Sequence, residues 1–111
     1  MARDNKGASV DGHTNDRHWA LLAHGIRRQI IVFMAGQAEP LSPADVAAGL
    51  HSQGFRIPNT DVYYHVRRLA REGAINLEDE VSAGGSLKHL YSVDAGFLAL
   101  PLVAALVAGA V

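Results

Sequence analysis

NTDVYYHVRRLAR, residues 59–71, is the stretch of sequence that decides the fold. Val62, Val66 and Leu69 recur in it at intervals of three and four residues, so a helix places all three on one face. Gly73 follows directly and is a typical helix stop. The pattern therefore predicts a helix that begins at one of the first two residues of this stretch and runs to Gly73.

Two segments rich in β-forming residues come next, 75–81 and 87–93. Between them stands SAGGS, residues 82–86, whose glycines suit a hairpin loop. We expect a β-hairpin directly after the helix.

Upstream, Asp16 can cap a helix that ends near Gly36, and His24-Gly25 can divide this helix in two. Its apolar stripe consists of Trp19, Leu22, Ile26, Ile30 and Phe33.

The run Ser42-Pro43-Ala44-Asp45 then supplies an N-cap, a proline at the first helical position and an acid at the third. A short helix to about Gly54 is expected, with Val46, Ala47 and Leu50 turned inward. The fold class predicted for residues 16–94 is mainly α with a small β-hairpin (α+β), in the order typical of a winged helix-turn-helix domain.

Composition restricts the function. A chain of 111 residues with 49% hydrophobic content is the size of one compact domain, and it contains no cysteine. The formal net charge of −1 counts against nucleic-acid binding, although Arg67, Arg68 and Arg71 concentrate positive charge in one segment. The polar start, residues 1–15, is interpreted as a disordered arm without a secretory signal, which favours a cytoplasmic protein.

Several motifs together resemble the ArsR-like winged-helix transcriptional regulators. They cover about residues 17–93, and PadR-like and other winged-helix regulators share much of the pattern. The motifs are HGIRRQI (24–30), LSPADVA (41–47), VYYHVRRL (62–69), GAI (73–75) and GSLKHLY (85–91). The resemblance implies a homodimeric repressor or activator whose two recognition helices enter successive major grooves of double-stranded DNA.

The residue types supply the chemistry for DNA binding. Side chains near the start of a recognition helix reach base edges, so Thr60, Tyr63 and Tyr64 are base-contact candidates, and the later arginines are phosphate-contact candidates. Alternatively, the arginines form an ordinary solvated helix face, and Tyr63 packs on the preceding helix. The complete candidate set is Ser42, Asn59, Thr60, Tyr63, Tyr64, Arg67, Arg68, Arg71, Lys88 and His89.

Metal binding and catalysis find no support in the sequence. The six histidines form no ligand pair, and no catalytic constellation or phosphate loop is recognisable. We therefore expect no metal, no cofactor and no enzyme activity. His65, beside the apolar stripe, is interpreted as a hydrogen-bonded boundary histidine, and Glu78-Asp79-Glu80 as a solvated strand edge.

The tail, residues 95–111, carries no charged or hydrogen-bonding side chain. We favour an apolar C-terminal helix that packs with the first helix across a two-fold dimer interface. The alternative is a membrane anchor, in an interaction module that does not bind DNA. Against it, Pro101 interrupts the helix, and the helix is shorter than the thickness of a bilayer. The expected dimer contacts are Trp19, Leu22, Phe97, Leu98, Leu102 and Leu106.

Overall fold

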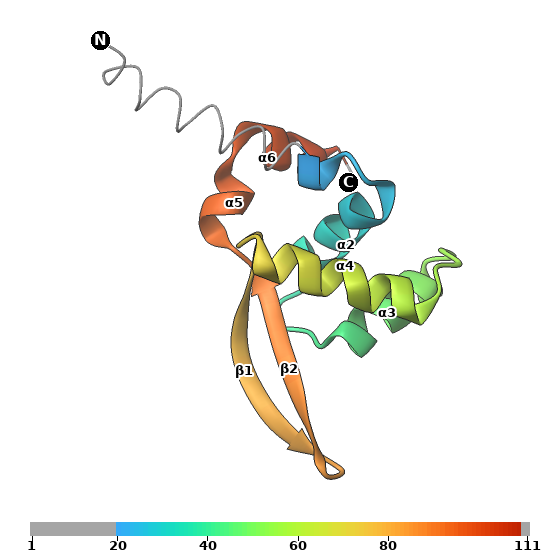
Figure 1. The fold of residues 1–111 in the computed structure, drawn as a ribbon. Coiled ribbons are helices and arrows are strands. Elements are labelled where there is room, and N and C mark those ends of the chain that lie inside the picture. Colours follow the sequence, from blue (N-terminus) through green and yellow to red (C-terminus); the bar gives the residue numbers. More distant parts are fainter. Residues whose placement is uncertain (1–19, 110–111) are drawn as a thin grey trace.

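The computed structural model describes residues 20–109. The expectations for the arm at 1–15, for Asp16 and for Trp19 therefore lie outside the described residues. Within them the fold is α+β, with helices gathered on one side and a two-stranded antiparallel hairpin projecting from them (Figure 1). The elements are α2 (Gly25–Ala35), α3 (Pro43–Ser52), α4 (Asn59–Arg71), β1 (Ile75–Ala83), β2 (Ser86–Val93), α5 (Ala95–Ala99) and α6 (Pro101–Ala108).

The first predicted helix is divided, as His24-Gly25 allowed. Residues 20–22 form a helical turn, the chain bends, and α2 begins at Gly25 with His24 as its N-cap. The His24 Nδ1 atom accepts a hydrogen bond from the Ile26 N–H at 3.3 Å. Arg27 and Arg28 donate back to the carbonyls of residues 21 and 22, at 2.7 and 2.6 Å, so two guanidinium groups hold the bend in place.

The predicted start of α3 is confirmed in detail. The Ser42 hydroxyl accepts from the Asp45 N–H at 3.1 Å, and the Asp45 carboxylate accepts from the Ser42 N–H at 3.0 Å, which completes a capping box ahead of Pro43. On the inner side, α3 packs closely on α2 at Gly49, where an added Cβ would lie 2.0 Å from the Phe33 ring. The residues predicted to face inward, Val46, Ala47 and Leu50, are all buried.

The helix α4 begins at Asn59, with Pro58 at the N-cap and no side-chain cap, and it ends at Arg71. Its predicted stripe is fully buried at Val62, Val66 and Leu69. These side chains join the core made by α2 and α3. The helix is therefore fixed along its length by burial of one face.

The hairpin is longer than predicted, because its loop is shorter. The expected five-residue loop, 82–86, is wrong: the chain turns at Gly84 and Gly85 alone, with φ of 59° and 87°. Two consecutive positive φ angles match the two-residue turns that favour glycine, so Ser82 pairs with Leu87 and Ala83 with Ser86. The strands therefore reach the turn itself.

The hairpin is joined to the helices by one short bridge. Leu41, just before α3, exchanges two backbone hydrogen bonds with Tyr91 of β2, each 2.8 Å. This pairing sets the position of β2 relative to the start of α3. The exposed part of the hairpin extends beyond it.

The single C-terminal helix expected for residues 95–111 is instead two short helices, α5 and α6. Leu100, with φ of −63° and ψ of 136°, is extended because the following proline disfavours helical geometry. The side chains of Phe97 and Val103 are buried in the same core cluster as the other helices, and α6 packs on α2. Among residues 20–109, no helix has both the length and the apolar content that a membrane span requires.

Candidate nucleic-acid interface

The start of α3, the middle of α4 and the end of the hairpin together enclose an open groove of about 410 Å³, here called the interface groove. Five of the ten residues predicted to contact DNA line it, contributed by three separate elements. These five are Ser42, Tyr63, Arg67, Lys88 and His89. Pro43, Ala44, Ser86 and Leu87 complete the lining.

The outward face of α4 borders this groove. Since Val62, His65, Val66 and Leu69 are buried, the opposite side of the helix faces solvent. Tyr63 and Arg68 are half-buried, and the remaining predicted residues of the helix are all exposed there or at the helix start, with Tyr64 at 49% exposure. This exposed set consists of Asn59, Thr60, Tyr64, Arg67 and Arg71.

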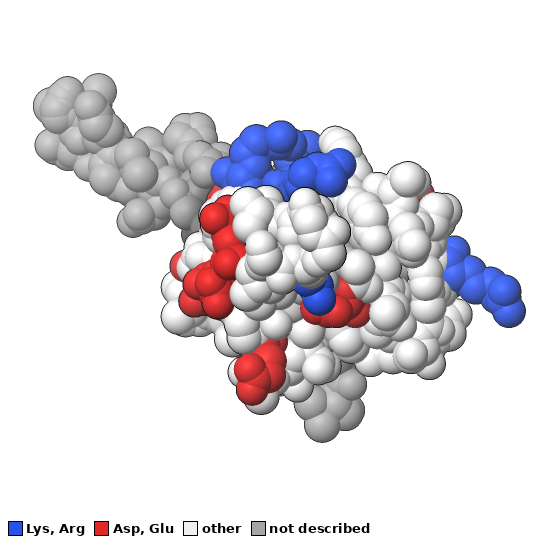
Figure 2. Space-filling model, turned by 90° about the horizontal axis from the view of Figure 1, so that it is seen from below, with Lys and Arg blue, Asp and Glu red and all other residues white. Residues whose placement is uncertain are grey.

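Positive charge gathers on the α4 side of the molecule. Figure 2 shows the largest patch of lysine and arginine side chains at one edge, with smaller blue areas elsewhere and acidic side chains beginning just beside the patch. Arg68 pairs with Glu72, one helical turn later, at 3.6 Å. Within residues 20–109 neither Arg67 nor Arg71 takes part in an ion pair, so both guanidinium groups can meet a phosphate.

The hairpin carries negative charge outside the lining of the interface groove. Its strand β1 exposes three consecutive carboxylates, residues 78–80, as the sequence predicted. The pairing register sets Glu80 directly opposite His89, and the Glu80 carboxylate lies 2.8 Å from His89 Nε2. Sequence reasoning placed His89 at DNA without this partner, which only the register reveals. Lys88 is the hairpin's one lysine or arginine.

His65 is a buried histidine with a defined partner. It keeps 7% exposure, and its Nδ1 lies 3.4 Å from Arg27 Nη1. Burial chiefly, and then the charges of His24 and Arg27, lower the pKa of His65. The prediction of a hydrogen-bonded boundary histidine is confirmed. The sequence alone does not predict that His24 and Arg27 lie beside His65, because they belong to the start of α2 and His65 belongs to α4.

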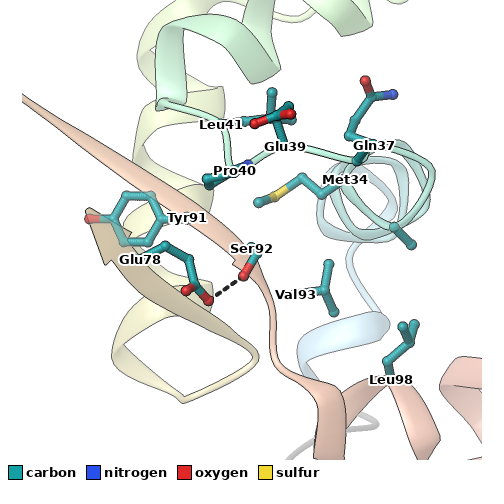
Figure 3. Close-up of a pocket in the computed structure, with 12 residues that line it drawn as sticks. Met34, Gln37, Glu39, Pro40, Leu41, Glu78, Tyr91, Ser92, Val93 and Leu98 are labelled. Carbon is teal, nitrogen blue, oxygen red and sulfur yellow. Dashed lines mark hydrogen bonds between the residues drawn. The ribbon is translucent and has the colours of Figure 1, made fainter. Parts of the chain in front are cut away.

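A second cavity, of about 340 Å³, opens on the far side of the Leu41–Tyr91 bridge (Figure 3). Met34, Val93 and Leu98 form an apolar part of its wall, while the Ser92 hydroxyl donates a hydrogen bond to the Glu78 carboxylate. Its charged lining residues are Glu39 and Glu78, so it is acidic and does not extend the positive surface.

No family model, curated protein or solved structure matches the chain.

The residues predicted for the dimer interface differ in accessibility. Leu22 and Phe97 keep 2% exposure each within the single chain, so in this conformation they offer no surface to a partner. Leu98 and Leu106 are half-buried against the core, whereas Leu102 is 53% exposed. Trp19 lies outside the described residues. The part of the tail that can meet a partner is thus centred on Leu102 of α6.

Within residues 20–109, no three histidine, aspartate or glutamate side chains come together as a potential metal site.

Proposed function

We propose that this protein is a sequence-specific DNA-binding transcriptional regulator with winged helix-turn-helix architecture. In this proposal α3 and α4 form the helix-turn-helix, α4 enters the major groove, and the β1–β2 hairpin is the wing beside the DNA backbone. The compartment expected for such a regulator is the cytoplasm, and its partner is double-stranded DNA.

The observation that carries the proposal is the convergence of three elements on the interface groove. Ser42, Arg67 and Lys88 are distant in sequence, yet all line one groove beside the exposed face of α4. Backbone phosphates are contacted by lysine and arginine side chains of this kind. The Ser42 side chain is only 2% exposed and its hydroxyl forms the capping box of α3, so the phosphate contacts are proposed for Arg67 and Lys88. The exposed ring of Tyr64 and the hydroxyl of Thr60 supply the adjacent groups for base edges.

A homodimer completes the proposal. Two copies related by a two-fold axis would place their α4 helices about 34–36 Å apart, one turn of DNA, over an inverted repeat. The exposed, uncharged surface of α6 around Leu102 is the contact we propose between copies, because a second copy can bury it.

Salt-dependent binding to a pool of genomic DNA fragments, with the solution mass recorded, tests the proposal. The expected result is a dimer that selects an inverted repeat with affinity falling steeply as salt rises. Arg67→Ala and Lys88→Ala should each lower the salt slope by about 0.9, the value for one lost phosphate contact. Arg56→Ala is the matched control, because Arg56 is exposed on the α3–α4 connection and does not line the interface groove. Absence of DNA binding at low salt would overturn the proposal.

A second candidate function is a winged-helix protein-interaction module without DNA binding. The specific observation in its favour is the exposed acidic run of β1, Glu78 to Glu80, which repels DNA phosphates and suits a basic protein surface. Under this hypothesis Arg67→Ala would leave binding to the partner unchanged, whereas reversing the β1 charges would abolish it.

A further inference from the structure

Four basic side chains meet where the start of α2 contacts one flank of α4, and we call them the basic cluster. Tyr63 and Arg67 face the interface groove, so residues 65 and 68 lie on the other flank of the helix. The basic cluster is therefore separate from the interface groove, and the outer face of α4 lies between them. The members of the cluster are His24, Arg27, His65 and Arg68.

Direct contacts join His24, Arg27 and His65, while Arg68 acts on Arg27 and His65 through its charge. The rings of His24 and His65 have centroids 4.3 Å apart, and Arg27 Nη1 lies 3.4 Å from His65 Nδ1. Arg27 is anchored a second time, through Nε, to the Leu21 carbonyl. The ring of Tyr64, on the outer face, meets the His65 ring edge-on at 5.1 Å. The cluster thus has a fixed geometry next to the surface proposed for DNA.

The charges in the basic cluster oppose one another. Burial first, and then the positive charge of Arg68, lower the pKa of Arg27. The pKa of His65 is lowered by burial, then by His24, Arg27 and Arg68, and only Asp61 acts in the other direction. Like charges held together in this way are relieved by a bound anion, and perturbed groups of this kind mark functional sites.

The available donors suit an oxyanion. His24 Nδ1 already accepts the Ile26 N–H, so the neutral ring carries its proton on Nε2 and can donate it. Arg68 keeps 38% side-chain exposure, and its contact with Glu72, at 3.6 Å, is longer than a strong charge-assisted hydrogen bond. His65 accepts from Arg27 and thereby orients it, which makes His65 a positioning residue.

We propose that His24, Arg27 and Arg68 form a second phosphate-binding site, which takes a backbone phosphate next to the one bound at Arg67. The assignment to a DNA phosphate rests on the proposed function. The capacity to bind a tetrahedral oxyanion does not, because it follows from the basic cluster alone. DNA would then be held on both flanks of α4, by the interface groove on one side and by the basic cluster on the other.

The first experiment uses the full chain without DNA. Inorganic sulfate is titrated at constant ionic strength against chloride, and the ring proton resonances of His24 and His65 are followed by NMR at several pH values. Saturable shifts of both ring resonances are expected, with sulfate raising the pKa of His65, since a bound anion favours its charged form. Equal responses to sulfate and chloride would overturn the site.

Three variants make this experiment specific. His24→Asn keeps a good N-cap while removing the ring, and Arg27→Met keeps the length while removing the charge. Both should abolish the sulfate response. Arg28→Met is the matched control, because Arg28 makes the same kind of bond to the bend as Arg27 but has no contact with His65 within the described residues.

The second experiment distinguishes a DNA phosphate from a free anion. Arg27→Met should lower the salt slope of DNA binding by about 0.9, while Arg28→Met leaves it unchanged. A series of duplexes is then used in which one backbone phosphate at a time is replaced by neutral methylphosphonate. The variant and the parent should bind with equal affinity only when the replaced phosphate is the one that Arg27 contacts. Sulfate binding with normal DNA binding by Arg27→Met would overturn the DNA assignment. Sulfate binding by a protein that binds no DNA would support the anion site and refute the proposed function.

Discussion

The helix α4 and the β1–β2 hairpin meet at the same groove but are stabilised in different ways. Four residues of α4 are buried, and three of them are apolar side chains with no exposure. In the hairpin only Ile75 is buried, and Leu77 and Leu87 remain 49% and 59% exposed. The helix is therefore fixed by the core along its length. The hairpin is attached at its base, through Ile75, Tyr91 and Val93, and its outer part depends on its own turn and cross-strand pairing.

Charge follows the same division. The helix carries Arg67, Arg68 and Arg71, while β1 carries three exposed carboxylates. In the proposed complex with DNA, α4 would therefore supply most of the electrostatic attraction. The hairpin then contributes through Lys88 and through its shape, with Glu80 neutralising part of the charge of a protonated His89.

The largest effect is expected from truncating the buried face of α4. Leu69→Ala should lower the free energy of unfolding by about 2–5 kcal/mol, because it leaves a cavity in a closed core. The matching change on the hairpin, Leu87→Ala, should cost less than about 0.5 kcal/mol, since this side chain is mostly in water. Urea unfolding of both variants measures the difference. Equal losses would show that the hairpin is part of the core.

A smaller effect is expected at the hairpin turn. Gly85→Ala should cost about 1–2 kcal/mol, because its φ of 87° is unfavourable for a residue with a Cβ. Gly36→Ala, at the end of α2, is the control, since its φ is −87° and the new Cβ would meet nothing closer than 3.7 Å. Thermal unfolding and the amide exchange of β1 should both report the loss. Unchanged exchange in Gly85→Ala would contradict the account of the turn.

Acid should weaken the α2–α4 contact through His65. Its pKa in the folded protein lies below the ordinary value of 6.5, so on acidification the unfolded chain binds the proton first. Stability is therefore complete above about pH 6.5 and falls as the pH decreases towards the folded pKa, by at most about 1.4 kcal/mol per pH unit.

Urea unfolding of the parent and of His65→Gln at pH 7, 6 and 5 tests this prediction. Glutamine keeps an acceptor for Arg27 but does not titrate. The free energy of unfolding should therefore decrease less on acidification in the variant, by the contribution of one protonation. An identical pH profile in the variant would assign the acid sensitivity to other groups.

The smallest effect is expected at the surface pair of α4. Glu72→Gln should change the free energy of unfolding by no more than about 0.5 kcal/mol, because the Arg68–Glu72 pair is partly exposed and spans one helical turn. It should also strengthen DNA binding slightly, since it frees Arg68 and removes a negative charge. A loss of DNA affinity would show that Glu72 orients Arg68.

Local patterns in the sequence predicted the helices and the general position of the hairpin. The capping box at Ser42 and the stripe of Val62, Val66 and Leu69 are both local signals, so they could be found without tertiary information. The length of the hairpin loop was missed because SAGGS is compatible with several turns. The division of the tail at Leu100 follows from Pro101, which is a local signal in the sequence.

Side-chain identity and spacing thus determined by themselves which residues form helices, which form strands, and that α4 has one apolar and one basic face. Only the tertiary structure decided which distant residues share a surface. It placed Ser42, Arg67 and Lys88 at one groove, His24 and Arg27 at His65, and Glu80 opposite His89. The reason is physical: periodicity acts between neighbours in the chain, whereas these contacts depend on how helices pack and on the register of two strands.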